Sequence, residues 1–144
     1  MITIEPIKFS DLEAFSQVIA QLFGAPSTRQ NLEHSLKNIL NDPAYLLLGA
    51  KENDRLVGTV MGITCFDTVG ECQPFMVLEN LVVDKECKGK GIGKRLVQAA
   101  EEYAHKQNCY YIMLLSSSYR TEAHRFYEAI GYSSDAAKGF KKYL

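Results

Sequence analysis

Two segments of the chain combine residue types and spacings that suit the binding of a phosphate and the transfer of a proton. The first is Lys85–Arg95, which contains three glycines and five Lys or Arg residues against a single acid, Glu86. Glycines let successive backbone N–H groups point into one cavity, and a helix that begins there adds the positive end of its dipole. The segment therefore predicts a site for a phosphate group.

Several kinds of loop contain glycines at this density. A Walker loop is excluded because Arg95 stands where a Ser or Thr hydroxyl is needed. A dinucleotide-binding loop is excluded because Gly93 comes one residue too early after Gly91. Two interpretations stay open. One is a plain turn with solvated lysines, and the other is the acetyl-coenzyme A loop Arg/Gln-x-x-Gly-x-Gly/Ala, which Lys88–Gly93 fits with Lys at its first position.

The second segment is Ala123–Tyr132, which matches the pattern Ala-x-x-Phe-Tyr-x-x-x-Gly-Phe with Tyr at the last position. With both segments in this order, the chain resembles the GCN5-related N-acetyltransferase (GNAT) superfamily. The resemblance covers the whole chain and is strongest over residues 75–132. Leu115–Tyr127, together with Asn41–Pro43, also looks like the bacterial aminoalkylphosphonate N-acetyltransferase subgroup, which acetylates small primary amines that bear an acidic group.

The resemblance implies that acetyl-CoA is the co-substrate. Because the chain has only three histidines and its four cysteines form no CxxC pair, no metal is expected. In the family, the pyrophosphate of acetyl-CoA lies on the backbone amides of the glycine loop. The pantetheine arm pairs like an added strand with the end of a long strand, in a cleft beside the next one, here Leu114–Ser116. Carried over to this chain, the cofactor-binding residues are Leu81, Val82, Val83, Lys88, Gly89, Lys90, Gly91, Ile92, Gly93, Lys94, Ser116 and Arg120. Arg120 stands where many family members have Asn, so a coenzyme phosphate or an anionic acceptor is an alternative partner for it.

The implied reaction is attack by an amine on a thioester, which needs a base and an acid. The base removes a proton from an ammonium group whose pKa is about 10, and the acid protonates the departing thiolate. Tyr127 aligns with the tyrosine acid of the family, although a packed core aromatic is the alternative. Glu79 is the single acid in the run Phe75–Val83 and is the expected base. Burial would raise its pKa and favour that role; a carboxylate paired with a base, or pointing to solvent, is the alternative.

The elements that must position these residues follow from hydrophobic periodicity and turn residues. Apolar alternation and apolar runs predict strands at Met1–Lys8, Tyr45–Glu52, Arg55–Phe66, Phe75–Val83, Tyr110–Leu115 and Tyr132–Leu144. Helical spacing predicts helices over Asp11–Phe23, from Ser27 or Thr28 to Asp42-Pro43, after Gly89–Gly93, and over Thr121–Ile130. The order of these elements implies an α/β (α+β) sheet with helices on both faces, in one domain that spans residues 1–144. The resemblance adds a mixed, mostly antiparallel sheet of six to seven strands, splayed in the middle, and four helices.

Composition narrows the class of protein. The formal net charge of −1 excludes a general polyanion binder, so no nucleic-acid partner is expected. Residues 1–72 carry −4 and residues 73–144 carry +3, which points to two surfaces of opposite sign. No apolar stretch approaches the roughly 20 residues of a membrane span, and no signal peptide begins the chain. The four cysteines have no metal-ligand spacing and predict free thiols in the cytoplasm.

The leading hypothesis is therefore direct acetyl transfer to the primary amine of a small molecule, polyamine-like or aminoalkylphosphonate-like. Acetylation of a protein N-terminus or lysine, and a non-catalytic acetyl-CoA sensor, are the alternatives. The acceptor pocket is expected from Phe23–Arg29, Asp67–Pro74 and the face of the long strand. Asp67 and Glu71 favour a cationic acceptor, whereas Arg29 favours an anionic one. A homodimer is left open.

Overall fold

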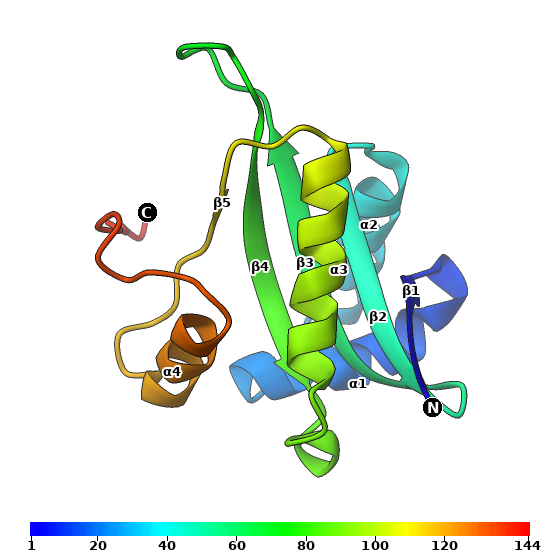
Figure 1. Ribbon diagram of the computed structural model, residues 1–144. Coiled ribbons are helices and arrows are strands. Elements are labelled where there is room, and N and C mark those ends of the chain that lie inside the picture. Colours follow the sequence, from blue (N-terminus) through cyan, green and yellow to red (C-terminus); the bar gives the residue numbers. More distant parts are fainter. The chain divides into compact units, whose positions relative to one another are not determined.

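A five-stranded sheet forms the centre of residues 1–113 (Figure 1). The computed structural model describes all 144 residues, in two units that span residues 1–113 and 114–144. The strands lie in chain order and are β1 (Ile2–Pro6), β2 (Tyr45–Glu52), β3 (Arg55–Cys65), β4 (Phe75–Val83) and β5 (Ile112–Met113). The first four strands pair antiparallel, and β4 pairs parallel with β5. The predicted mixed, mostly antiparallel sheet is therefore confirmed.

Helices cover both faces of this sheet, as the sequence predicts (Figure 1). The helices α1 (Leu12–Phe23) and α2 (Arg29–Asn41) lie on one face, and α3 (Ile92–Lys106) lies on the other. Two short 3₁₀ turns, η1 (Phe9–Asp11) and η2 (Lys85–Cys87), precede α1 and α3. On the α1/α2 face the core contains Ile7, Leu12, Phe15, Val18, Leu36, Leu47, Leu56 and Val82. On the α3 face, Ile92 and Leu96 approach Gly58 so closely that a Cβ there would lie 3.2–3.3 Å from their side chains.

The turn between β2 and β3 forms where the sequence predicts a hairpin. Asn53 and Asp54 both have positive φ, 51° and 65°. Two consecutive residues of that kind make the two-residue turn that matches the twist of the flanking strands, and Asn and Asp tolerate it best. We call Glu52–Arg55 the hairpin tip.

The second unit contains one helix and no strand, which corrects the predicted number of strands. Helix α4 (Thr121–Ala129) ends before Gly131, whose φ is 103°, as the sequence predicts. The strand expected at Tyr132–Leu144 is absent, and β5 is shorter than the predicted Tyr110–Leu115, so the sheet has five strands rather than six to seven. Ser133 and Ser134 are poor strand residues, and the Ser133 hydroxyl instead accepts the Asp135 N–H at 3.2 Å in a local turn.

Candidate functional site

A β-bulge in β4 decides which way the predicted base faces. Thr59 of β3 pairs with Val82, but Met61, two residues on, pairs with Glu79, so β4 carries one extra residue. Asn80 lies in the bulge with φ 54°. Residues three apart normally point to opposite faces of a strand, but the extra residue shifts that alternation. Glu79 therefore lies on the α1/α2 face, beside Met61, which packs against the core on that face.

Glu79 is exposed, so the expectation that burial makes it a base is wrong. Cross-strand neighbours share a face, yet β4 is exposed at both Glu79 and Asn80. Within residues 1–113 the carboxylate makes no hydrogen bond or ion pair, which leaves both oxygens open to solvent. Asn80 is exposed beside it and was not singled out from the sequence. The sequence signal that could have identified it is an Asn next to the single acid of an apolar run, because Asn tolerates positive φ.

The edge of β4 next to β5 is paired over two residues only. Met76 pairs with Ile112 and Val77 with Met113, after which β4 continues to Val83. In residues 1–113 no strand forms backbone hydrogen bonds with that remaining edge of β4. The predicted cofactor residues Leu81, Val82 and Val83 lie there. Unpaired N–H and C=O groups along an edge can bind an extended chain that carries amide groups.

The predicted glycine-rich turn, Gly89–Gly93, overlaps the start of α3; we call residues 85–91, which lead directly into this helix, the glycine loop. Gly89 and Gly91 have φ of 81° and 75°, and Gly91 is the N-cap of the helix. No side chain accepts a hydrogen bond from the first-turn amides, and no acid lies in that turn. Ile92 and Gly93 are buried, so they can offer only their backbone N–H groups to a ligand. The helix therefore presents unpaired donors and the positive end of its dipole at a glycine turn.

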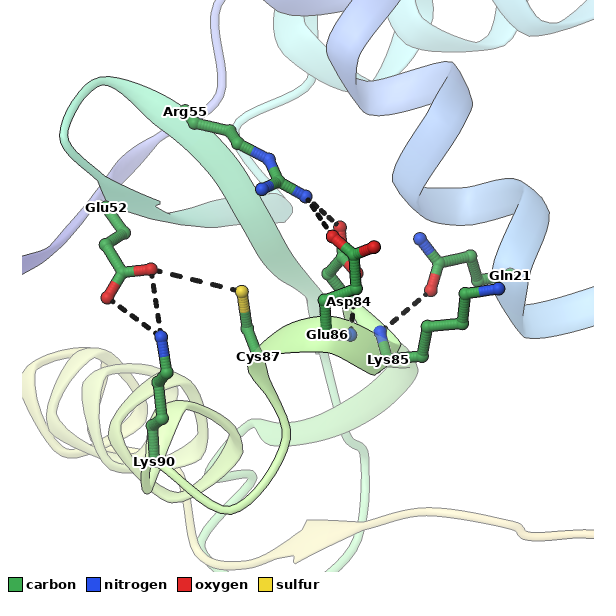
Figure 2. A network of polar contacts seen from close by, with 8 residues as sticks. All are labelled: Gln21, Glu52, Arg55, Asp84, Lys85, Glu86, Cys87 and Lys90. Carbon is green, nitrogen blue, oxygen red and sulfur yellow. Dashed lines mark hydrogen bonds and ion pairs between the residues drawn. The ribbon is translucent and has the colours of Figure 1, made fainter.

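The lysines of this region divide into two groups. Lys88 and Lys94 are exposed and make no ion pair, so they are available to an anion. Lys90 instead lies with its Nζ 3.2 Å from both carboxylate oxygens of Glu52, at the hairpin tip (Figure 2). The buried Cys87 thiol lies 4.0 Å from the same carboxylate. The prediction that Lys90 contributes to a phosphate site is therefore limited to its backbone N–H while this ion pair stands.

A second set of polar contacts holds the start of the glycine loop, and sequence reasoning missed it. The Asp84 carboxylate accepts from the Glu86 N–H at 3.0 Å and from Arg55 at 2.7 Å (Figure 2). The Lys85 N–H donates to Gln21 of α1 at 3.0 Å. The Arg55–Asp84 and Gln21–Lys85 contacts join residues 29 and 64 positions apart in the chain, so no local pattern signals them.

The second unit contains the remaining predicted residues. Tyr127 lies on α4, half-buried, with its ring edge-to-face against Phe126 and Tyr132 at 5.3 and 6.0 Å between centroids. Arg120 is exposed at the N-cap of α4, and its N–H donates to the Ser117 carbonyl at 3.0 Å. His124 Nε2 lies 2.9 Å from the same carbonyl, which gives this histidine a structural role. The Ser116 hydroxyl is buried without a hydrogen-bond partner.

The model of the acetyltransferase (GNAT) family matches residues 12–132, which include both the glycine loop and the α4 segment. This chain belongs to the GNAT family. It is an acyltransferase, and its reaction class is the N-acetyl transfer of that family.

Individual relatives agree with the family. YhfO of Bacillus subtilis (strain 168), described as an uncharacterized N-acetyltransferase, is 29% identical over 143 residues, which cover 97% of this chain and 94% of the relative. A solved structure of a putative acetyltransferase from Agrobacterium tumefaciens str. C58 has a TM-score of 0.92 at 25% identity and covers 99% of both chains. An aminoglycoside N-acetyltransferase, AAC(6')-Iy, solved in complex with CoA, has a TM-score of 0.87 over 99% of this chain and 95% of its own. At 18% identity it shows the shared GNAT fold alone.

The aminoalkylphosphonate subgroup is not confirmed. No cluster of three or more His, Cys, Asp or Glu side chains able to hold a metal ion occurs in this GNAT domain. No helix has both the length and the apolar character needed to cross a membrane.

The Asp84 contacts give this GNAT domain a pH-dependent stability. The hydrogen bond from the Glu86 N–H holds the pKa of Asp84 below its ordinary value of 3.8; burial acts in the opposite direction, and the Arg55 guanidinium lowers the pKa further. A carboxyl whose pKa is lower in the folded state stabilises the fold fully above pH 3.8, and this contribution is lost as the pH falls through its folded pKa. We expect Asp84→Asn to lower the free energy of unfolding by about 1–2 kcal/mol at pH 7.

Urea denaturation of both proteins between pH 7 and pH 3 measures this effect. The difference between them should narrow as the pH drops below about 4. Glu102→Gln on the exposed face of α3 is the control, and its urea denaturation curves should match those of wild type at every pH. A difference for Asp84→Asn that stays constant down to pH 3 contradicts the assignment.

Proposed function

We propose that this GNAT enzyme transfers the acetyl group of acetyl-CoA directly to the primary amine of a small molecule, polyamine-like or aminoalkylphosphonate-like. The observation that carries the proposal is the uncapped N-terminus of α3 behind Gly91, with Lys88 and Lys94 unpaired at its mouth. A diphosphate fits such a turn because backbone N–H groups, the helix dipole and two ammonium groups all act on it.

Further residues support acetyl-CoA as the co-substrate. The free edge of β4 at Leu81–Val83 begins where pairing with β5 has ended, and it leads to the glycine loop. An extended arm with two amide groups can pair along this edge while its phosphates lie at α3. The roles of Ser116 and Arg120 in coenzyme binding are proposed from the family resemblance alone. Acetyl-CoA supplies a thioester that activates the acetyl group toward amines.

The charges on the acceptor side favour a cationic small molecule. Arg29, the residue that favoured an anionic acceptor, forms an ion pair with Glu13 of α1 at 2.5 Å. Glu79 faces the same side of the sheet without a partner, and Glu71 is exposed in the loop that follows β3. Carboxylates without a partner, and an arginine that is already paired with a carboxylate, suit a substrate with several amino groups better than a phosphonate.

Two side chains are proposed to move protons. Glu79 accepts a proton from the acceptor ammonium through a water molecule, which its exposed position allows. Tyr127 donates its hydroxyl proton to the departing sulfur, as its match to the family motif indicates. All four cysteines are free thiols, and the reaction is proposed to take place in the reducing cytoplasm.

An amine panel tests the acceptor class. Purified protein and acetyl-CoA are mixed with spermidine, 2-aminoethylphosphonate, an aminoglycoside or a short peptide, and the release of free thiol is followed. We expect turnover to be fastest with spermidine. Glu79→Gln should lower kcat for the best amine by about tenfold, less than for a base sealed from water, because solvent reaches this position.

The panel separates the alternatives. Activity confined to peptides would identify a protein acetyltransferase and overturn the small-molecule proposal. Coenzyme binding in a thermal-shift assay without any thiol release would favour a sensor. Turnover that is fastest with the aminophosphonate would show that the acceptor-side carboxylates do not select charge. Glu71→Gln, which removes another exposed carboxylate, is the matched comparison for Glu79→Gln.

A further inference from the structure

The hairpin tip contacts the glycine loop at both of its ends (Figure 2). Glu52, at the end of β2, holds Lys90 through both carboxylate oxygens at 3.2 Å and lies 4.0 Å from the Cys87 thiol. Arg55, at the start of β3, holds Asp84 at 2.7 Å and Glu86 at 3.4 Å. Two residues of one turn therefore bracket the loop residues between Asp84 and Gly91.

From Lys88 to Gly91 the glycine loop has little else to hold it. Lys88 and Gly89 are exposed, and a Cβ at Gly89 or Gly91 would meet no atom within 4 Å. Glycines also have more conformational freedom to lose on ordering than any other residue. A loop of this kind orders its N–H groups for a ligand only if neighbouring elements restrain it, or it orders on binding at a cost in affinity.

We propose that Glu52 and Arg55 are positioning residues for coenzyme affinity. They hold the glycine loop in its ligand-binding conformation without touching the ligand. This inference rests on the proposed use of the loop for acetyl-CoA. In this arrangement the Lys90 side chain anchors the loop to Glu52, whereas Lys88 and Lys94 act on the phosphates.

The direction in which Glu52→Gln changes the KM for acetyl-CoA distinguishes a positioning role from competition with the phosphates. If Glu52 competed with the phosphates for Lys90, Glu52→Gln would free the ammonium and lower the KM for acetyl-CoA. If Glu52 positions the loop, the same change loosens the loop and raises that KM. We expect a rise of about threefold to fivefold, with kcat changed less than twofold.

A double-mutant cycle gives the second readout. Lys90→Met should raise the KM to the same extent as Glu52→Gln, and the double variant should show no further rise, because both changes remove one contact. Lys90→Arg, which keeps a cation in reach of Glu52, should raise the KM less than Lys90→Met does. Arg55→Gln should raise the KM independently at the other end of the loop.

Amide hydrogen exchange on the ligand-free protein reports the loop directly. Residues 88–94 should exchange faster in Glu52→Gln than in wild type. Glu5→Gln is the matched control, since Glu5 pairs with Lys51 of β2 at 2.8 Å and does not contact the glycine loop. It should change neither exchange in the loop nor the KM.

Calorimetric titration with coenzyme A tests the positioning role of Glu52 and Arg55 separately from the proposed function. If the wild-type protein does not bind coenzyme A, the proposed function and the inference fail together. If wild type binds and Glu52→Gln binds as tightly or more tightly, only the positioning role is overturned. Weaker binding by Glu52→Gln and by Arg55→Gln, with Glu5→Gln unchanged, supports it.

Discussion

Replacing Tyr127 by phenylalanine is expected to lower kcat for acetyl transfer by about 100-fold or more, with a small change in the KM for acetyl-CoA. Protonation of a leaving group by a positioned acid contributes about 10²–10⁴ in rate. The substitution removes only the hydroxyl. The ring contacts with Phe126 and Tyr132 do not depend on that group, so α4 should keep its packing. Steady-state kinetics with the best amine, together with thermal unfolding, measure both quantities.

A surface tyrosine provides the control for this change. Tyr143 is 84% exposed near the C-terminus, and Tyr143→Phe should leave kcat and the unfolding temperature at wild-type values. A Tyr127→Phe enzyme with at least half the wild-type kcat would show that Tyr127 is a packing residue. In that case the family assignment stands, and another group or water must protonate the sulfur.

Replacing Asn80 by valine is expected to lower kcat/KM by about 100-fold. The substitution acts on the bulge in β4, which positions several groups at once, and not on a single reacting group. A β-branched residue disfavours the left-handed conformation that Asn80 adopts with φ 54°, at a cost of about 1–2 kcal/mol. Removing the bulge would shift the alternation of β4, turn Glu79 to the other face and move the edge at Leu81–Val83. Both the proposed base and the proposed coenzyme contacts are then displaced.

Asn80→Gly is the matched variant for this experiment. Glycine adopts positive φ without strain, so the bulge and most of the activity should persist although the Asn side chain is gone. Kinetics and urea denaturation of the two variants separate backbone from side chain. Equal losses in Asn80→Gly and Asn80→Val would assign the effect to the carboxamide, and full activity in Asn80→Val would show that the bulge is not required.

Local sequence patterns predicted most of the first unit because the interactions that form it are local. Helical spacing of Leu12 and Phe15 places both in the core on one face of α1. The Asn53-Asp54 pair turns the hairpin, and Gly91 caps α3 with positive φ. Each of these features depends on conformational preferences that a residue carries wherever it stands.

Patterns failed where a second segment decides the outcome. Period-2 alternation does not reveal an extra residue in β4, so the sequence left open whether Glu79 is buried or points to solvent. The apolar and aromatic residues of Tyr132–Leu144 suggested a strand, but propensity alone does not supply a partner, and no strand forms there. Lys90 was grouped with the other loop lysines because its partner, Glu52, lies 38 residues earlier.

The sequence by itself determined the family, the order of helices and strands, and the glycine turn that precedes α3. Those properties depend on motifs and on short-range conformational preferences, which can be recognised in a sequence without knowing its tertiary contacts. Only the tertiary structure decided that Glu79 is exposed on the α1/α2 face of the sheet, and that Arg29 forms an ion pair with Glu13. It also decided that the hairpin tip holds both ends of the glycine loop. These outcomes depend on strand register and on charges brought together from distant parts of the chain, and neither is encoded at any one position.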